Sequence, residues 1–226
     1  MNVAVHVSPE VVAAWPEYRA VVVTADGVRN GPSDEASERL LAAAERAARE
    51  CGLERAADDP RIAAWRAAFS EFGAKPSRYL SSAESLLARV LKGEQLPRIN
   101  ALVDTYNAVS LRHAVPVGGE DLDVLLGDLR LVRATGEEDF DGDEAPRPGE
   151  VVWRDDAGVT CRRWNWRQGT RTRLTEATTR AFFVFDGLPP LAPAALDAAA
   201  AELIDQLRAR SADVRIGVQR PTSAPS

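Results

Sequence analysis

The sequence predicts an α+β fold, with helices on one side of an antiparallel or mixed sheet. Two short apolar segments near the N-terminus, 2–7 and 19–24, have the composition of strands. Helix-like segments fill the middle of the chain, and short apolar or alternating runs separated by turn residues follow after residue 128. Strands and helices therefore do not alternate as in a doubly wound protein, and this order favours α+β.

The helices are predicted from their caps and from apolar spacing. Ser33 is the expected N-cap of an Ala-rich helix, and Asp59 with Pro60 opens the next one. Ser81 and Glu84 have capping-box spacing and begin a third helix. The expected helices cover residues 33–51, 59–72, 81–92, 99–113 and 192–210.

Strands are predicted in the second half of the chain, followed by a tail. The expected strands cover residues 129–134, 150–154, 159–166, 181–185 and 214–218. Residues 1–218 are expected to form one domain. Residues 219–226 are rich in Pro and Ser, so we expect a disordered tail there.

Composition limits the possible functions. The 226 residues carry a formal charge of −6, which argues against a general nucleic-acid coat and predicts no DNA partner, so any RNA must bind through a local patch. No basic, apolar leader and no apolar stretch of membrane-spanning length is present, so we expect a cytoplasmic protein without a membrane partner. One acidic run predicts a solvated loop: Glu137, Glu138, Asp139, Asp141, Asp143 and Glu144.

Cysteine, histidine and motif content predict neither a metal nor a cofactor. Cys51 and Cys161 lack metal-ligand spacing and are expected as reduced thiols. His113 stands near a helix end, where a capping or surface role is favoured over general base catalysis. No nucleophile, phosphate-binding or dinucleotide motif is present, and the sequence by itself identifies no catalytic residue.

The segment 161–173 is the most distinctive part of the sequence. It holds five arginines and two tryptophans, without an acidic residue between Asp156 and Glu176. Guanidinium groups grip phosphates or carboxylates, and indole rings stack on bases. The alternative is a strand with one solvated face and one core face.

Polar residues elsewhere could line a pocket. Asn100, Asp104 and Asn107 share one helix face at spacings of four and three. They line a ligand pocket, form a solvated face or cap neighbouring strands, and Asp104 could pair with an arginine. Thr172 belongs to a threonine cluster near the basic segment, and Glu176 is the nearest carboxylate, with a salt bridge as its ordinary explanation.

These residues resemble a known module. Residues 96–111 (Leu-Pro-Arg-Ile-Asn-Ala-Leu-Val-Asp-Thr-Tyr-Asn-Ala-Val-Ser-Leu), followed by Pro116-x-Gly118-Gly119-x-Asp121, are similar to the start of the B3/B4 editing and tRNA-binding module of the phenylalanyl-tRNA synthetase β-subunit. The chain resembles more closely free-standing proteins built around this module. The likeness covers roughly 80–210 and leaves 1–79 as an N-terminal strand–helix extension.

The resemblance implies a three-layer arrangement with a β-sandwich-like core flanked by helices. It also implies a pocket between the Asn/Asp helix and the later strands, which in the synthetase hydrolyses tyrosine wrongly attached to phenylalanine tRNA. Tyr106 and Asn107 stand where the module has a Thr-Asn pair. The ligand-pocket candidates are Asn100, Asp104, Tyr106, Asn107, Asn165, Thr172 and Glu176, and the tRNA or phosphate candidates are Arg162, Arg163, Trp164, Trp166, Arg167 and Arg171.

Two functions follow as hypotheses. The first is hydrolysis in trans of the ester of a mischarged tRNA, in which Asn100 and Asn107 hold the aminoacyl group, Arg163 and Arg167 hold phosphates, and Trp164 or Trp166 stacks on the terminal adenine. No machinery for charging tRNA is recognised. The synthetase module has a later loop with an editing-site glutamate, which has no counterpart between Phe185 and the last helix. The alternative is therefore a non-catalytic module that binds tRNA or an amino acid, and a third option is another small-molecule pocket in which the arginines grip a carboxylate.

Overall fold

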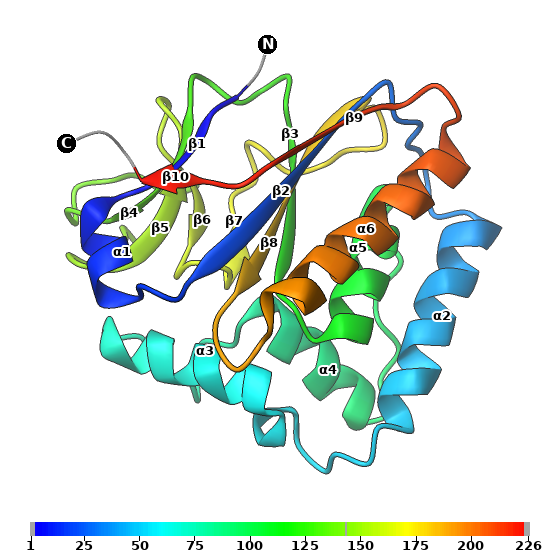
Figure 1. Ribbon diagram of the computed structural model, residues 1–226, viewed down its shortest axis with the longest axis horizontal. Helices are drawn as coiled ribbons and strands as arrows, with labels where there is room; N and C mark the ends of the chain where they lie inside the picture. Colours follow the sequence, from blue (N-terminus) through cyan, green and yellow to red (C-terminus); the bar gives the residue numbers. More distant parts are fainter. Residues whose placement is uncertain (1–2, 143, 224–226) are drawn as a thin grey trace.

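Two β-sheets pack face to face, and helices cover the outer face of one of them (Figure 1). The structure is a computed structural model that describes residues 3–142 and 144–223. Within this part of the chain, one sheet has the strand order β10-β1-β4-β5-β6-β7 and the other β3-β8-β2-β9. The strands are β1 Val5–Val7, β2 Arg19–Asp26, β3 Val117–Asp121, β4 Leu129–Arg133, β5 Val151–Arg154, β6 Val159–Arg162, β7 Arg167–Gln168, β8 Arg180–Gly187, β9 Arg215–Gln219 and β10 Thr222–Ser223.

The helices follow the predicted order, with one addition near the N-terminus. The α-helices are α1 Pro9–Ala14, α2 Glu35–Arg49, α3 Pro60–Glu71, α4 Ser82–Leu91, α5 Ala101–His113 and α6 Pro193–Arg210, and a 3₁₀ turn covers Ala56–Asp58. Figure 1 shows α5 and α6 side by side over the β3-β8-β2-β9 sheet, with α2 on their far side.

Strand β8 organises the layers because both of its faces are buried. Phe182 and Val184 pack in the core between the two sheets, together with residues of β1, β4 and β5. Phe183 and Phe185 point the other way, into the core beneath α5 and α6. Sheet, sheet and helices therefore form successive layers, which confirms the predicted α+β class and the sandwich-like core with flanking helices.

The N-terminal 79 residues supply inner strands of both sheets. Strand β1 lies between β10 and β4 and is parallel to both. Strand β2 lies between β8 and β9 and is antiparallel to both. The segment predicted as an extension is thus continuous with both sheets.

The cap of helix α2 differs from the sequence-based expectation, and the predicted capping box of helix α4 is only half formed. Helix α2 is capped by Asp34 rather than Ser33: Ser37 N donates to Asp34 Oδ1 at 2.9 Å, and Asp34 N donates to Ser37 Oγ at 3.1 Å. Helix α4 has the predicted cap, because Glu84 N donates to Ser81 Oγ at 3.2 Å. The Glu84 carboxylate pairs with Arg66 and does not close the box.

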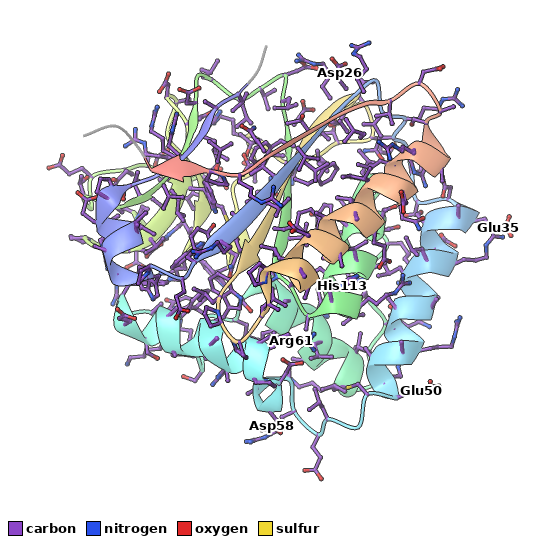
Figure 2. All side chains as sticks on the ribbon, viewed as in Figure 1. Asp26, Glu35, Glu50, Asp58, Arg61 and His113 are labelled. Atoms are coloured by element: carbon purple, nitrogen blue, oxygen red, sulfur yellow. The ribbon has the colours of Figure 1, made fainter. Side chains whose placement is uncertain are left out.

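His113 links three helices. Arg61, at the start of α3, donates to the backbone oxygen of His113 at 2.8 Å, and the His113 ring lies 2.7 Å from Glu202 of α6. Figure 2 labels Arg61 and His113 in this region, whereas Glu35, Glu50 and Asp58 point away from the protein. The interactions of His113 agree with a structural role.

Three further segments differ from the expectation. Helix α1 is too short for its periodicity to show in the sequence. Strand β3 (Val-Gly-Gly-Glu-Asp) has weak strand propensity and is a strand because it pairs with β8. Of the expected strand 159–166, only β6 is a strand, and residues 163–166 form the turn that leads into β7.

The C-terminal segment also differs from the expected disordered tail. Gln219 ends β9, and β10 pairs in parallel with β1. Residues 224–226 lie outside the described residues, as does Asp143 of the predicted acidic loop.

Candidate functional site

A cavity of about 120 Å³ lies where the two sheets meet helices α4 and α5. Since one water needs roughly 10–15 Å³ by this kind of measure, the space suits an amino-acid-sized group with water. The lining residues are Ser82, Tyr106, Asn107, Val117, Gly118, Glu120, Trp153, Cys161, Trp164, Asn165, Trp166, Arg167, Gln168, Val184 and Asp186.

One wall of the cavity comes from α5 and β3. Tyr106 and Asn107, two of the ligand-pocket candidates, reach the cavity from the helix. A Cβ atom on Gly119 would lie only 2.9 Å from the Tyr106 ring, so a glycine is needed for this close packing of helix and strand. The Asn107 side chain makes no hydrogen bond with the described part of the protein, and its carboxamide is available to a ligand.

The opposite wall comes from the turn between β6 and β7. Arg163 and Trp164 both have left-handed backbone conformations, with φ of 45° and 63°. Such a conformation is uncommon for bulky residues and is held here by a 2.7 Å hydrogen bond from Trp164 N to Val151 O. As a result, the Trp164 ring enters the core, and Asn165 and Trp166 line the cavity.

Glu120 supplies a buried carboxyl group to the cavity. Its side chain is 4 % exposed, and its Oε2 atom has no hydrogen-bond partner. Burial raises the pKa of Glu120 to about 7, although the nearby hydroxyls of Thr160 and Thr172 lower it. At neutral pH this carboxyl can therefore both accept and release a proton.

Asp186 supplies a second buried carboxyl group. It is 1 % exposed, and it accepts hydrogen bonds from the Tyr18 hydroxyl at 2.5 Å and from Asn165 Nδ2 at 3.3 Å. Burial raises the pKa of Asp186 to about 7, against the lowering effect of these two donors.

Polar atoms without partners concentrate at this cavity. Among the described residues, twelve buried side-chain nitrogen or oxygen atoms lack a hydrogen-bond partner, and five of them belong to residues that line the cavity. Those five residues are Ser82, Glu120, Trp153, Trp164 and Asn165. Because buried polar groups in folded proteins are nearly always satisfied, this concentration indicates a site for a polar ligand.

The cavity also contains a thiol and a phenol, neither of which is activated. Burial raises the pKa of Cys161 well above its ordinary value, and burial likewise raises the pKa of Tyr106. Both groups stay protonated at neutral pH, so the cavity offers carboxyl groups rather than a thiolate nucleophile.

The predicted ligand-pocket residues divide into two groups. Tyr106, Asn107 and Asn165 line the cavity. Asn100 instead caps α5 by accepting from Val103 N at 3.0 Å, and Asp104 accepts from Ile99 N at 3.0 Å.

The remaining two predicted residues lie outside the lining. Thr172 is buried beside Glu120, whose pKa its hydroxyl lowers. Glu176 is exposed in a turn before β8 and does not line the cavity.

Most of the predicted phosphate-binding side chains have partners within the protein. Arg162 holds Glu150 with two hydrogen bonds of 2.9 Å, and Arg171 holds Asp155 with two of 2.7 and 2.9 Å. Arg163 is 3 % exposed and lies between the rings of Tyr79 and Trp166.

The two tryptophans of the segment 161–173 differ in burial. Trp164 is fully buried and packs edge-on against Trp15, Tyr18 and Trp65. Trp166 is half-buried and lines the cavity next to the exposed Arg167, which marks the opening. Of the predicted tRNA-contacting residues, Trp164, Trp166 and Arg167 line the cavity, and of these three Trp166 and Arg167 also reach solvent.

Glu120 and Asp186 were not singled out from the sequence. Each is an acidic residue inside a strand, in Val-Gly-Gly-Glu-Asp and in Phe-Phe-Val-Phe-Asp-Gly. An acid within a buried apolar strand is costly unless it serves a purpose, and that signal was present in the sequence.

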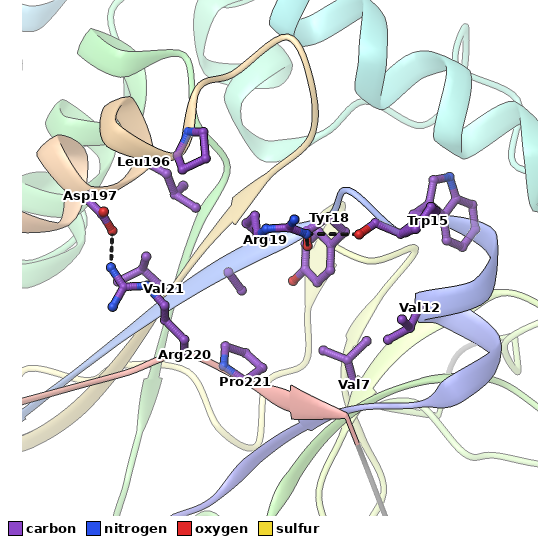
Figure 3. A pocket seen from close by; sticks show the side chains of 13 residues that line it. Val7, Val12, Trp15, Tyr18, Arg19, Val21, Leu196, Asp197, Arg220 and Pro221 are labelled. Atoms are coloured by element: carbon purple, nitrogen blue, oxygen red, sulfur yellow. Dashed lines mark hydrogen bonds and ion pairs between the residues drawn. The ribbon is translucent and has the colours of Figure 1, made fainter.

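A second and larger cavity, of about 240 Å³, lies between α1, β2, α6 and the C-terminal strands (Figure 3). Its wall is mainly apolar, and Arg220 pairs with Asp197 at its edge at 2.6 Å. None of its lining residues, all of which the structure describes, has an unpartnered buried polar atom. Tyr18 separates the two cavities, because its ring lines this one and its hydroxyl binds Asp186.

Two searches of the described residues gave negative results. Among residues 3–142 and 144–223, no group of three or more His, Cys, Asp or Glu side chains is placed to hold a metal ion. No helix in the same ranges is both long enough and apolar enough to cross a bilayer.

The protein is a two-sheet α+β protein, and the cavity between its sheets and helix α5 combines apolar rings with a few buried polar groups, as small-molecule sites commonly do. The sequence gives the family: the model of the B3/4 domain matches residues 64–206, and the chain belongs to this family. No curated protein is significantly similar to it.

A solved structure shares the fold. It is an N-terminal fragment of the phenylalanyl-tRNA synthetase beta-subunit from Pyrococcus horikoshii, and it matches with a TM-score of 0.51 and 13% sequence identity. The match covers 100% of this chain and 56% of that fragment, so the chain spans about half the length of its neighbour. At this identity the likeness shows the fold.

Proposed function

We propose that this protein is a tRNA-associated hydrolase that cleaves the ester of a mischarged aminoacyl-tRNA in trans, with Glu120 as the general base. One observation carries the proposal: a buried carboxyl with a pKa of about 7 faces a cavity of amino-acid size. The B3/4 family and the fold shared with a phenylalanyl-tRNA synthetase subunit support tRNA as the partner. Such a partner would place the protein in the cytoplasm.

The reaction can be written with the groups at hand. The Glu120 carboxylate takes a proton from a water molecule, whose oxygen attacks the ester carbonyl carbon. The free carboxamide of Asn107 donates to the carbonyl oxygen as negative charge develops on it. When the tetrahedral intermediate collapses, the carbon–oxygen bond to the ribose breaks, and the leaving oxygen takes the proton from Glu120. The products are a free amino acid and an uncharged tRNA.

The opening of the cavity suits the 3′ end of a tRNA. The half-buried Trp166 ring offers a face for the terminal adenine, and the exposed Arg167 offers a charge for a nearby phosphate. Of the six residues predicted to contact tRNA or phosphate, these two are the ones to which we assign the contacts.

The test is deacylation of a panel of correctly and wrongly charged tRNAs by the purified protein. Release from at least one mischarged tRNA is expected. Glu120→Gln should lower its rate by about 100-fold or more, and Asn107→Ala by about 10- to 100-fold. Glu176→Gln is the matched control, because this glutamate is exposed and does not line the cavity, and its rate should equal that of the wild type.

A non-catalytic role in binding tRNA or an amino acid is the second candidate. The five unpartnered polar atoms favour it, since a bound ligand would satisfy them without any reaction. Binding of tRNA or an amino acid without loss of any ester would establish this role and refute the hydrolase. Binding that weakens steeply with salt would identify the ligand as tRNA rather than a free amino acid.

A further inference from the structure

The buried part of the cavity holds two carboxyl groups and no base. Glu120 and Asp186 are almost fully buried. Among the described residues that line the cavity, Arg167 is the one basic side chain, and it is exposed at the opening. A ligand group deep in the cavity therefore contacts carboxyl groups, aromatic rings, and neutral amide and hydroxyl groups.

The two carboxyls lie on one face of the same sheet, at a distance that suits one small ligand. Glu120 of β3 pairs with Phe182 of β8, and Asp186 lies four residues further along β8. Residues 182, 184 and 186 share a face, and four residues of strand correspond to about 13 Å. Val184 and Gly118 line the cavity between them. Because both carboxyl groups line one cavity, an ammonium group at one of them and a water molecule at the other could flank a single α-carbon and ester carbonyl.

Among the residues that the structure describes, neither carboxyl forms an ion pair with a cationic side chain. Asp186 accepts from the neutral Tyr18 hydroxyl and the neutral Asn165 carboxamide, and Glu120 Oε2 accepts from nothing. The buried acids Glu150 and Asp155, in contrast, each bind an arginine. Buried carboxylates are normally paired because an isolated charge is costly to desolvate. The unpaired acids of the cavity are thus arranged to receive a cation from outside the protein.

We propose that Asp186 binds the ammonium group of an aminoacyl ester, so that the cavity takes amino acids whose carboxyl group is esterified or amidated and rejects free amino acids. The inference rests on the proposed function for the aminoacyl nature of the ligand. A free amino acid would bring its own carboxylate between Glu120 and Asp186, where no buried base balances it. The same repulsion would release the amino acid formed by hydrolysis.

Tyr18 is the positioning residue for Asp186. Its hydroxyl holds Asp186 Oδ1, and its ring is fixed edge-on against Trp164 with 4.9 Å between centroids. The hydroxyl also lowers the pKa of Asp186. Its loss should therefore leave the carboxyl more easily protonated at neutral pH and less precisely aligned with the ammonium group.

The test measures binding alone, with stable probes. For each amino acid, three compounds with the same side chain are compared: the amino acid amide, the free amino acid, and the N-acetyl amino acid amide. The N-acetyl amide lacks the charged ammonium group. Calorimetry at neutral pH should show at least one amide that the wild type binds about tenfold more tightly than either of its counterparts. Asp186→Asn should bind that amide no more tightly than the N-acetyl compound. Glu120→Gln should retain a preference for the amide.

Three results would overturn the inference: equal or tighter binding of the free amino acid by the wild type, an unchanged preference in folded Asp186→Asn, or no binding of any amide. If Asp186→Asn does not fold, Tyr18→Phe is compared with the wild type instead. This variant should bind the amide more weakly and show a smaller preference for it over the N-acetyl compound at neutral pH. Amide preference without tRNA deacylation would uphold this inference and refute the hydrolase. Deacylation that needs Glu120, in a protein that does not prefer the amide, would support the hydrolase and refute this inference.

Discussion

Residues 162–164 and residues 165–168 are adjacent and similar in composition, but their surroundings are opposite. Arg162, Arg163 and Trp164 are buried, with partners inside the protein. Trp166 and Arg167 line the cavity and reach solvent. The two left-handed residues at the start of the turn reverse the chain and separate the two environments. Arginine and tryptophan content therefore indicates a binding surface only after the internal partners of each side chain are known.

The buried half also supports the cavity-lining half. The Arg163 guanidinium lies 3.7 Å from the Tyr79 ring centroid and 4.4 Å from that of Trp166. The Trp166 ring packs edge-on against Tyr79 at 4.9 Å. A rigid aromatic face at the opening lowers the entropy cost of binding a base, so the inner residues contribute to recognition without contacting the ligand.

The tryptophan pair gives the largest expected difference. Trp164→Ala should lower the free energy of unfolding by about 3–5 kcal/mol, because it opens a hole among Trp15, Tyr18 and Trp65. Trp166→Ala should cost about 1–2 kcal/mol, since its ring is only half-buried. Urea denaturation of both variants measures the difference, and equal losses would contradict the division of the segment.

The arginine pair tests the same division through charge. Arg162→Ala removes the two hydrogen bonds that Arg162 donates to the buried Glu150 carboxylate. It should lower the free energy of unfolding by about 3–5 kcal/mol. Arg167→Ala removes an exposed side chain whose cation–π contacts with Phe140 and Trp166 are weak, so it should cost about 1 kcal/mol or less. The comparison fails if the two variants have the same denaturation midpoint.

Asp186, which Asn165 contacts at the boundary of the two halves, gives a pH-dependent effect. Because burial raises the pKa of Asp186 to about 7, the folded protein favours its protonated form. This contribution to stability is complete below the ordinary carboxyl range and is lost as the pH rises through about 7. Asp186→Asn should therefore flatten the fall in unfolding free energy between weakly acidic and neutral pH. Identical pH profiles for the two proteins would refute the raised pKa.

The smallest effect concerns tRNA binding, and it depends on the proposed function. Arg167→Ala should weaken tRNA binding several-fold. It should also reduce the number of counterions released on binding, given by the slope of the logarithm of the binding constant against that of the salt concentration, by about one. Arg173→Ala is the control, since this exposed arginine does not line the cavity. Filter binding over a range of salt concentrations measures both. Equal loss in the two variants would indicate a diffuse basic surface in place of a tRNA contact at the cavity.

The sequence predicted the elements that depend on local signals. The cap at Ser81, Pro60 at a helix start and the apolar run of β8 indicated those elements correctly. Strand β3 could not be predicted in this way, because its strand conformation depends on pairing with β8, 60 or more residues later in the chain. The turn at Arg163 and Trp164 also escaped prediction, since neither residue type favours left-handed backbone.

The candidate site was predicted in part for the same reason. Tyr106, Asn107 and Asn165 were found through the resemblance and do line the cavity. Asn100 and Asp104 share their helix face by spacing, but their side chains complete backbone hydrogen bonds. Glu120 and Asp186 become prominent only when the fold shows that no cation accompanies them. Spacing along the chain predicts which residues share a face, whereas partners from distant segments decide what each one does.

The most direct test of the central claim is the pH dependence of single-turnover deacylation of the responsive mischarged tRNA, from about pH 5.5 to about pH 8.5. With Glu120 as general base, the rate should rise with pH and level off above a midpoint near 7, because the carboxylate is the active form. Glu120→Gln should lose that inflection together with most of the rate, while Glu176→Gln should keep both. A rate that Glu120→Gln leaves unchanged, with the same pH profile as the wild type, would contradict the account.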